Sequence, residues 1–147
     1  MSTESTAHVL AESTPTAPEM DITPQDLRRV FGNFATGVVV ATTLDAHDNP
    51  VGVTVNSYTS VSMSPPLVLF CLDNRSANLS AFENCGAFVI NILADDQQQL
   101  SRQFASKVPN RFEGVHWSQG QLEQPILHGA LAFMECEAEQ IYEGGDH

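Results

Sequence analysis

Five short segments with the periodicity of β-strands constrain the fold of this chain more than any other feature. They are GVVVATTL (37–44), VGVTVNS (51–57), LVLFCL (67–72), AFVINIL (87–93) and ALAFMECEAEQIY (130–142). Turn-forming residues join the first two into a predicted hairpin, and the unbroken apolar run of the third predicts a strand buried on both faces. Most connections are too short for crossovers between parallel strands. The sequence therefore predicts an α+β, mainly β protein, built as an antiparallel barrel or sandwich.

A first helix is predicted to begin near residue 23. Thr23 offers an N-cap oxygen, Pro24 needs no amide partner at that position, and Asp26 completes a capping-box pattern. Apolar side chains then repeat at helical spacing: Leu27, Val30, Phe31 and Phe34. We expect this face to pack on an apolar surface and the helix to end at Gly37.

Two further helices are predicted between the strands. RSANLSAFENC (75–85) is expected to use Ser76 as its cap. DDQQQLSRQFASK (95–107) is expected to be capped by Asp95 or Asp96, with Leu100, Phe104 and Ala105 on one side. The segment that follows, VPNRFEGVHWSQGQLEQPIL (108–127), is predicted to be a loop.

The first 20 residues are mostly Ser, Thr, Ala, Glu and Pro, a composition typical of a disordered tail. This leaves residues 21–147 as one predicted domain. No apolar run approaches the length of a membrane span, and no signal peptide pattern is present at the start of the sequence. The three cysteines are widely spaced without a CxxC pattern, so we expect small buried side chains in a reducing cytoplasm.

The charge of the chain excludes several kinds of partner. The formal net charge is -12, so there is no basic field to attract a nucleic acid or an anionic membrane surface. Four of the six basic residues nevertheless fall between positions 75 and 111: Arg75, Arg102, Lys107 and Arg111. A small anionic ligand would have to use these few cations and backbone amides. For Arg102 a solvent-exposed helix face is the expected alternative.

Common catalytic motifs are missing from the sequence. It contains no GxGxxG, no GxxxxGK[ST] and no GxSxG, and its five histidines never fall at HxxxH or HExxH spacing. We therefore predict no metal site. What remains is an unusual polar stretch, TVNSYTSVSMSPP (54–66), between two apolar segments. It is either an ordinary surface loop or a set of donors and acceptors for a flat ligand with polar edges.

Six blocks of sequence, taken in order and with their spacing, resemble the short-chain flavin reductase family, the reductase components of two-component flavin-dependent monooxygenases. They are FATGVVVATT (34–43), GVTVNSYTSVSMSPPLVLFCLD (52–73), the Arg-Ser-x-Asn segment (75–78), FVINILADDQQQLSRQFAS (88–106), RFEGVHW (111–117) and GGDH (144–147). The resemblance implies a split β-barrel of Greek-key type with flanking short helices. It also implies FMN or FAD bound at a homodimer interface, with NADH or NADPH as co-substrate.

The same resemblance implies roles for individual residues. The ring and ribityl chain of the flavin would be bordered by Asn56, Ser57, Tyr58, Thr59 and Ser60. Its phosphate end would lie near Ser76 and Asn78, although family members often carry Thr in place of Asn78. Ser106, Lys107 and Arg111 would fix the phosphate or the incoming nicotinamide nucleotide. Phe112 and His147 would lie near the nicotinamide. His147 could orient the nicotinamide or the phosphate; the alternative is that it merely ends a Gly-Gly turn.

The activity implied is transfer of a hydride from NAD(P)H to flavin, with reduced flavin leaving for a monooxygenase. Apolar walls from Val53 and Val55 would complete the flavin site. A non-catalytic flavin-binding or sensing protein on the same barrel remains an alternative, as does an interaction domain without a ligand. Members of the family usually continue past the GGDH block with a strand or two, so we expect this domain to lack part of the barrel and to present an open edge.

Overall fold

The computed structural model describes residues 22–147, so the predicted tail over residues 1–20 lies outside the described part of the chain. The described residues fall into two units, one that ends at residue 35 and one that spans residues 36–147. The first unit contains helix α1, and the second contains all the strands and the remaining helices.

Helix α1 spans Pro24–Phe31 and begins with the predicted capping box. The hydroxyl of Thr23 accepts a hydrogen bond from the amide of Asp26, whose carboxylate accepts one from the amide of Thr23. The predicted end at Gly37 is wrong, because the helix stops at Gly32. The side-chain amide of Asn33 donates to the carbonyls of Arg29 and Val30 at the helix end, and the backbone amide of Asn33 donates to the Val30 carbonyl as well.

The apolar face of helix α1 finds no apolar partner within its own unit, residues 22–35, so its expected packing stays a prediction. No residue of α1 is buried, and its apolar side chains are exposed, together with one that follows the helix: Leu27, Val30, Phe31 and Phe34. Burial of this face therefore needs a surface outside residues 22–35.

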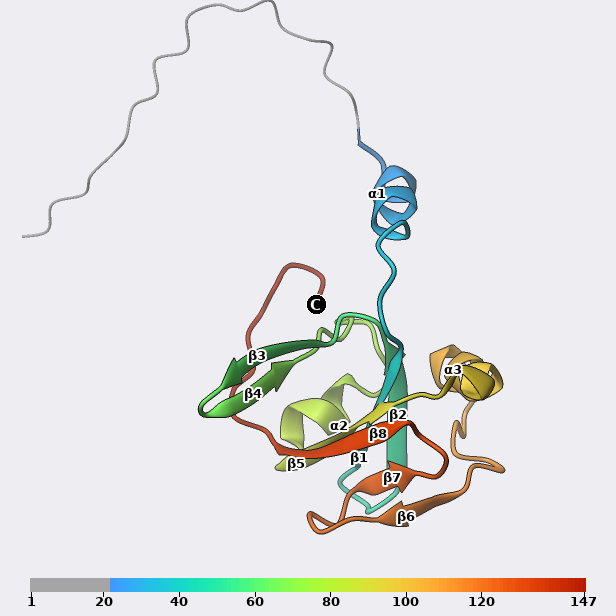
Figure 1. Ribbon diagram of the computed structural model, residues 1–147, viewed down its shortest axis with the longest axis vertical. Coiled ribbons are helices and arrows are strands. Elements are labelled where there is room, and N and C mark those ends of the chain that lie inside the picture. The colour runs from blue at the N-terminus through green and yellow to red at the C-terminus, as the bar shows by residue number, and fades with distance from the viewer. Residues whose placement is uncertain (1–21) are drawn as a thin grey trace, which may run out of the picture. The chain divides into compact units, whose positions relative to one another are not determined.

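Four antiparallel strands form the main sheet of the second unit, in the order β2-β1-β5-β8 (Figure 1). They are β1 (Val39–Leu44), β2 (Pro50–Val55), β5 (Ala87–Ile92) and β8 (Ala132–Glu137). The predicted hairpin and the antiparallel, mainly β class are confirmed. Strand β1 is central and almost wholly buried, which agrees with its apolar sequence.

Two smaller hairpins were not predicted. Strands β3 (Thr59–Met63) and β4 (Pro66–Leu69) pair, as do β6 (Trp117–Gln119) and β7 (Pro125–Leu127). The polar stretch is thus a strand from Thr59 onward rather than a loop, and the predicted loop over 108–127 contains two short strands. Strand β4 is half-exposed, so the prediction of burial on both faces is wrong.

The helices of the second unit are capped differently from the prediction. Helix α2 (Leu79–Asn84) has Asn78 rather than Ser76 at its N-cap position. Asp95–Gln97 forms a 3-10 turn that leads into α3 (Gln98–Ala105), so neither aspartate caps that helix. On α3, Phe104 is fully buried, whereas Ala105 is exposed, in contrast to the expectation. No helix within residues 22–147 has the length and apolar character needed to cross a membrane.

Side chains of the main sheet alternate between two apolar clusters, as the period of two along a strand requires. One cluster contains Val39, Ala41, Val55, Phe82 and Ile90. The other contains Val40, Phe104, Phe112 and Leu127. The cysteines take a smaller part in the core than predicted, since Cys71 is exposed and Cys85 and Cys136 are half-buried free thiols.

A buried polar network ties β7 to the sheet. The amide of Asn91 donates to the Val40 carbonyl and to the Thr42 hydroxyl, each at 3.0 Å, and its oxygen accepts from the backbone amide of Leu127 at 2.9 Å. Thr42 in turn donates to the carbonyl of Pro125. Because every buried polar group of this network has a partner, its burial is tolerated.

Candidate functional site

A pocket of about 230 Å³ lies beside the C-terminal end of β2. Its apolar surface comes from Val53, Val55 and Leu72, and its polar groups include Asn56, Ser57 and Ser76. The pocket therefore combines apolar walls with small polar side chains, which is the composition of a site for a flat heterocycle. These residues come from β2, from the two residues that follow it and from residues 71–76, and His147 also borders the pocket.

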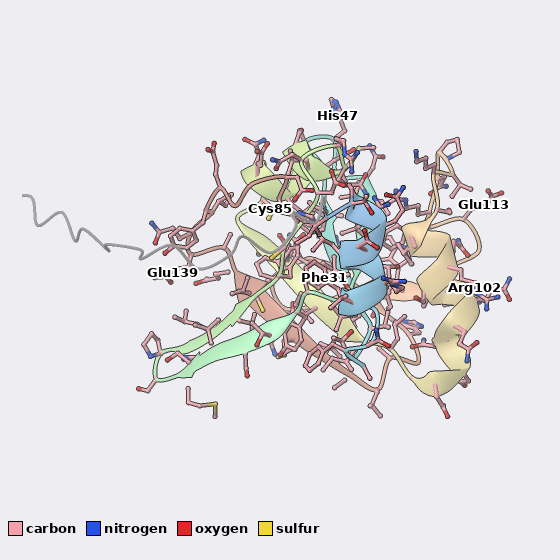
Figure 2. The ribbon with its side chains drawn as sticks, turned by 90° about the horizontal axis from the view of Figure 1, so that it is seen from above. Phe31, His47, Cys85, Arg102, Glu113 and Glu139 are labelled. Atoms are coloured by element: carbon pink, nitrogen blue, oxygen red, sulfur yellow. The ribbon has the colours of Figure 1, made fainter. Side chains whose placement is uncertain are left out.

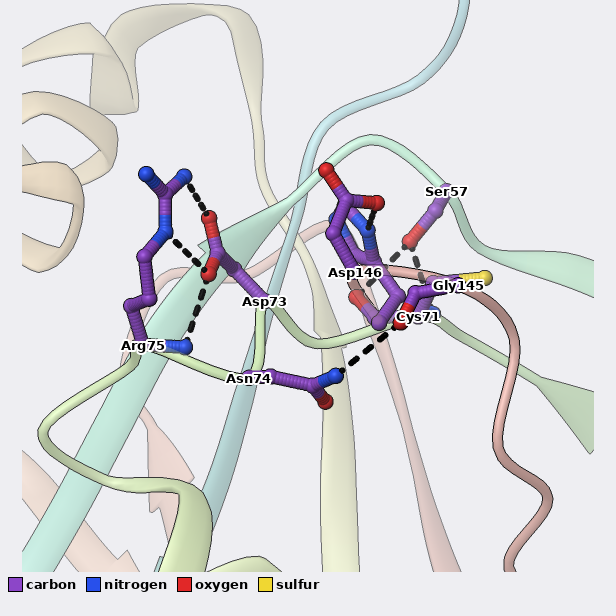
Figure 3. Close-up of polar contacts among 8 residues, drawn as sticks. Ser57, Cys71, Asp73, Asn74, Arg75, Gly145 and Asp146 are labelled. Carbon is purple, nitrogen blue, oxygen red and sulfur yellow. Dashed lines mark hydrogen bonds and ion pairs between the residues drawn. The ribbon is translucent and has the colours of Figure 1, made fainter.

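Ser57 joins the two sides of this pocket. Its hydroxyl accepts a hydrogen bond from the backbone amide of Cys71 at 2.8 Å and donates one to the carbonyl of Cys71 at 3.1 Å (Figure 3). The Ser57 hydroxyl thus serves as the hydrogen-bond partner of the Cys71 backbone, in place of a neighbouring strand, just after β2 ends. Asn56 is exposed, and its side-chain amide has no hydrogen-bond partner within residues 22–147, so this amide is available to a ligand.

Three residues of the polar stretch that were expected to border the flavin, Tyr58, Thr59 and Ser60, do not line the pocket. The hydroxyl of Tyr58 contacts the sulfur of Met134 at 3.9 Å, and its ring packs against the first apolar cluster. Thr59 and Ser60 lie exposed on β3, where the Thr59 hydroxyl donates to the Ser60 carbonyl at 3.2 Å.

Charged groups gather beside the pocket around Asp73. The guanidinium of Arg75 pairs with this carboxylate at 2.7 Å, and the backbone amide of Arg75 donates to it at 2.8 Å (Figure 3). These hydrogen bonds hold the pKa of Asp73 well below its usual range. Arg75 is therefore already engaged, which leaves it less free to bind an anionic ligand.

The segment that contains Gly145, Asp146 and His147 lies against the same loop. The backbone amide of Asn74 donates to the Asp146 carbonyl at 2.9 Å, and its side chain donates to the Gly145 carbonyl at 3.3 Å (Figure 3). The ring of His147 lies 2.8 Å from the Asp146 carboxylate, and hydrogen bonding to His147 lowers the pKa of that carboxyl. These contacts place the imidazole at the edge of the pocket.

Two of the predicted phosphate ligands meet at the carbonyl of Gly52. The side-chain amide of Asn78 donates to this oxygen at 2.9 Å, and a terminal nitrogen of Arg111 donates to it at 3.0 Å. Asn78 also donates its backbone amide to the hydroxyl of Ser76 at 3.3 Å, which connects this group to the pocket. Gly52 directly precedes Val53 of the pocket wall, so Arg111 contacts β2 one residue away from that wall.

Arg111 is a cation that has no acidic partner in the described part of the chain, residues 22–147. Its side chain is half-buried, burial lowers its pKa, and it forms no ion pair with a carboxylate of residues 22–147. One hydrogen bond to a carbonyl uses only one of the five donors of a guanidinium. The guanidinium of Arg111 therefore has donors left for an anionic ligand, so its expected role as a phosphate ligand stays a prediction.

Other predicted residues lie farther from this geometry. Ser106 ends α3 by donating its hydroxyl to the Gln103 carbonyl at 2.7 Å, and Lys107 is exposed. Arg102 extends outward from α3, which agrees with its expected exposure (Figure 2). Phe112 is 7% exposed and packs edge-on between Phe104 and Trp117, at centroid distances of 4.9 and 5.9 Å. The ring of Phe112 is a core side chain rather than part of the pocket surface.

The structure thus brings together Asn56, Ser57, Ser76 and His147 at the pocket, and Asn78 and Arg111 beside it. Sequence reasoning missed Leu72, Asp73 and the carbonyl of Gly52. A glycine inside a strand pattern signals close approach of another group, so Gly52 could have been found. Within residues 22–147 no group of three or more His, Cys, Asp or Glu side chains is arranged to hold a metal ion.

Comparisons with known proteins show the family to which the chain belongs. Residues 31–147 match the family model for the flavin reductase like domain. The chain is 42% identical over 126 residues to the reductase subunit HsaB of a flavin-dependent monooxygenase from Rhodococcus jostii, covering 86% of this chain and 64% of the relative. It is 45% identical over 124 residues to a Rhizobium meliloti protein named "Probable flavin reductase", covering 84% of this chain and 40% of that protein. The chain therefore spans less than two thirds of the length of these two relatives.

A solved structure shares both fold and sequence. The NADH:FAD oxidoreductase SgcE6 of Streptomyces globisporus, in complex with NAD and FAD fragments, superposes with a TM-score of 0.79 at 38% identity, covering 92% of this chain and 79% of that one. Together with the antiparallel sheets and short helices, this likeness confirms the predicted split-barrel fold class. The chain belongs to the family of flavin reductase like domains.

Proposed function

We propose that this chain is an NAD(P)H-dependent flavin reductase that transfers a hydride to FMN or FAD and supplies the reduced flavin to a partner monooxygenase. The observation that carries the proposal is the pocket at the end of β2, with apolar walls, small polar side chains and a half-buried arginine beside it. Relatives named as a monooxygenase reductase subunit and as an NADH:FAD oxidoreductase support the same reaction.

The residues present fit a flavin. Val53, Val55 and Leu72 offer apolar contact to the faces of the ring, and Asn56 and Ser76 offer hydrogen bonds to its polar edge and side chain. Arg111 supplies the positive charge that a phosphate needs. A bound flavin would itself supply the hydride-accepting chemistry, so the protein needs no strong acid or base for this step. The role of its side chains is to hold the two reactants in contact.

His147 is proposed to orient the nicotinamide. Its ring borders the pocket and is held by Asp146, whose carbonyl is in turn fixed by the Asn74 amide. This chain of contacts gives the imidazole a defined place without burying it. Replacement by alanine should therefore raise KM for the nicotinamide more than the Kd for flavin.

The test is oxidation of NADH and of NADPH, followed by absorbance, with FMN or FAD added to the purified chain. We expect flavin-dependent oxidation that falls in Arg111→Gln and is unchanged in Arg102→Gln, a matched variant on the exposed side of α3. Flavin binding without turnover would instead support the flavin-binding or sensing protein. Neither binding nor turnover by folded protein would overturn the proposal.

We also propose that the active form is a homodimer. The pocket, at about 230 Å³, is smaller than the roughly 300–1,000 Å³ typical of small-molecule sites, so one copy encloses only part of a flavin. The apolar face of α1 is a second supporting observation, because a helix face of this kind is normally covered and residues 22–35 supply no cover for it.

Light scattering coupled to size-exclusion chromatography tests the dimer. Phe31→Glu on the apolar face should shift the chain toward the monomer, whereas Gln25→Glu adds the same charge to an exposed polar site and should not. A wild-type chain that stays monomeric at every concentration would contradict the proposal. We further propose a cytoplasmic location, which the three free thiols support, since such thiols persist in reducing compartments.

A further inference from the structure

We infer that Gln103 is a positioning residue that holds Arg111 in place for the phosphate of the flavin. The inference deepens the proposed function and rests on it. Gln103 lies on the last turn of α3, and its side-chain amide nitrogen donates to two backbone carbonyls of the following loop, those of Arg111 at 2.8 Å and Glu113 at 2.9 Å. The two residues whose carbonyls accept these hydrogen bonds flank Phe112 in the sequence.

These bonds fix the backbone of Arg111 from one side. From the other side it is fixed by its neighbour Phe112, whose ring is buried between Phe104 and Trp117. Gln103 and Phe104 are adjacent on α3. The same helical turn therefore supplies both the hydrogen bonds from Gln103 and the ring contact from Phe104 that fix the loop. Arg111 is therefore fixed by the hydrogen bond to its own carbonyl and by the packing of the neighbouring Phe112 ring.

With its backbone fixed, Arg111 extends to β2 and donates to the carbonyl of Gly52, where Asn78 also donates. The Arg111 side chain is thus fixed at its backbone and at its guanidinium, yet no carboxylate of residues 22–147 neutralises the guanidinium. Holding a long side chain in this way reduces the entropy that an arginine loses when it binds an anion. Gln103 therefore acts on phosphate affinity through Arg111, without touching the ligand.

The experiment compares FMN with riboflavin, which differ by the phosphate alone, in four full-length chains: wild type, Gln103→Met, Arg111→Met and the double variant. Met has nearly the volume of Gln and cannot donate a hydrogen bond. Gln99→Met, on the exposed surface of the same helix, is the control and should bind both ligands like wild type. Binding is read from quenching of flavin fluorescence.

We expect Gln103→Met to weaken FMN binding by roughly 3- to 10-fold, the loss associated with one or two hydrogen bonds, with riboflavin binding unchanged. In the Arg111→Met background, the same change should have no further effect, because the residue through which it acts is gone. Equal weakening of FMN and riboflavin would show a merely structural role and overturn the inference. Additive losses in the double variant would overturn it too.

The outcomes also separate this inference from the function on which it rests. A wild-type chain that is folded but binds neither ligand overturns the proposed function and the inference together. A wild-type chain that binds FMN and riboflavin equally well refutes the phosphate role of Arg111, and hence the inference, while leaving flavin binding in place. Circular dichroism of each variant confirms that loss of binding is not loss of fold.

Discussion

Replacement of Gly52 by alanine is the substitution whose effect the structure defines most sharply. A Cβ at this position would lie 2.6 and 2.8 Å from two ring carbons of Phe104 and 3.2 Å from the methyl group of Thr42. Carbon atoms pack best at about 3.5–4.0 Å, so the ring must move away by roughly 1 Å. Phe104 is fully buried and packs edge-on against Phe112, which leaves it little room.

Such overpacking costs about 1–3 kcal/mol. The gain from replacing glycine by alanine inside a strand, about 0.5–1 kcal/mol, offsets part of this cost. We therefore expect Gly52→Ala to lower the free energy of unfolding by about 1–2 kcal/mol, measured as a fall in the urea midpoint. Flavin affinity should fall as well, because the Gly52 carbonyl holds Asn78 and Arg111.

The control is Gly86→Ala, where an added Cβ meets no heavy atom within 4 Å. Its urea midpoint should match or exceed that of wild type. Phe104→Leu removes part of the ring, so combining it with Gly52→Ala should destabilise less than the sum of the two single changes. Equal midpoints for Gly52→Ala and Gly86→Ala would refute the packing argument.

Two further predictions concern stability. Asn91→Leu leaves the buried Val40 carbonyl and Leu127 amide without their side-chain partner, so it should lower the free energy of unfolding by about 2–4 kcal/mol, measured in urea. A decrease of under about 0.5 kcal/mol would contradict the role of this network. The pKa of Asp73 is lowered by Arg75, so this carboxylate stabilises the fold above its unfolded value of 3.8, and the contribution is lost as the pH falls below 3.8 toward the folded pKa. Asp73→Asn should therefore flatten the decline of the urea midpoint in that acidic range, and an unchanged acid profile would refute the assignment.

The sequence was sufficient for the strands of the main sheet and for the start of α1. Strands β1, β2 and β5 are rich in β-branched residues and bounded by turns, and the capping-box pattern at Thr23 formed as predicted. These features are local, so single-sequence patterns report them. The small hairpins were missed because β3 is an exposed strand with polar side chains, and β6 and β7 have only three residues each.

The candidate site depended on contacts between distant segments, which sequence patterns report poorly. Ser76 was expected both to cap a helix and to lie near the flavin phosphate, and it lines the pocket instead of capping the helix. Asn78 takes the cap position, and its side chain donates to the Gly52 carbonyl. The family resemblance drew attention to Phe112, which the structure packs into the core. Arg111 was identified as an anion ligand, but its fixation by Gln103 and Gly52 is visible only in three dimensions.

A crystal structure of this chain in complex with FMN tests the central claim most directly. The account predicts that the flavin ring lies against Val53 and Val55, in the pocket that Asn56 and Ser76 border, with the phosphate within hydrogen-bond distance of Arg111. Flavin bound elsewhere on the molecule, or a phosphate that points away from Arg111, would contradict it.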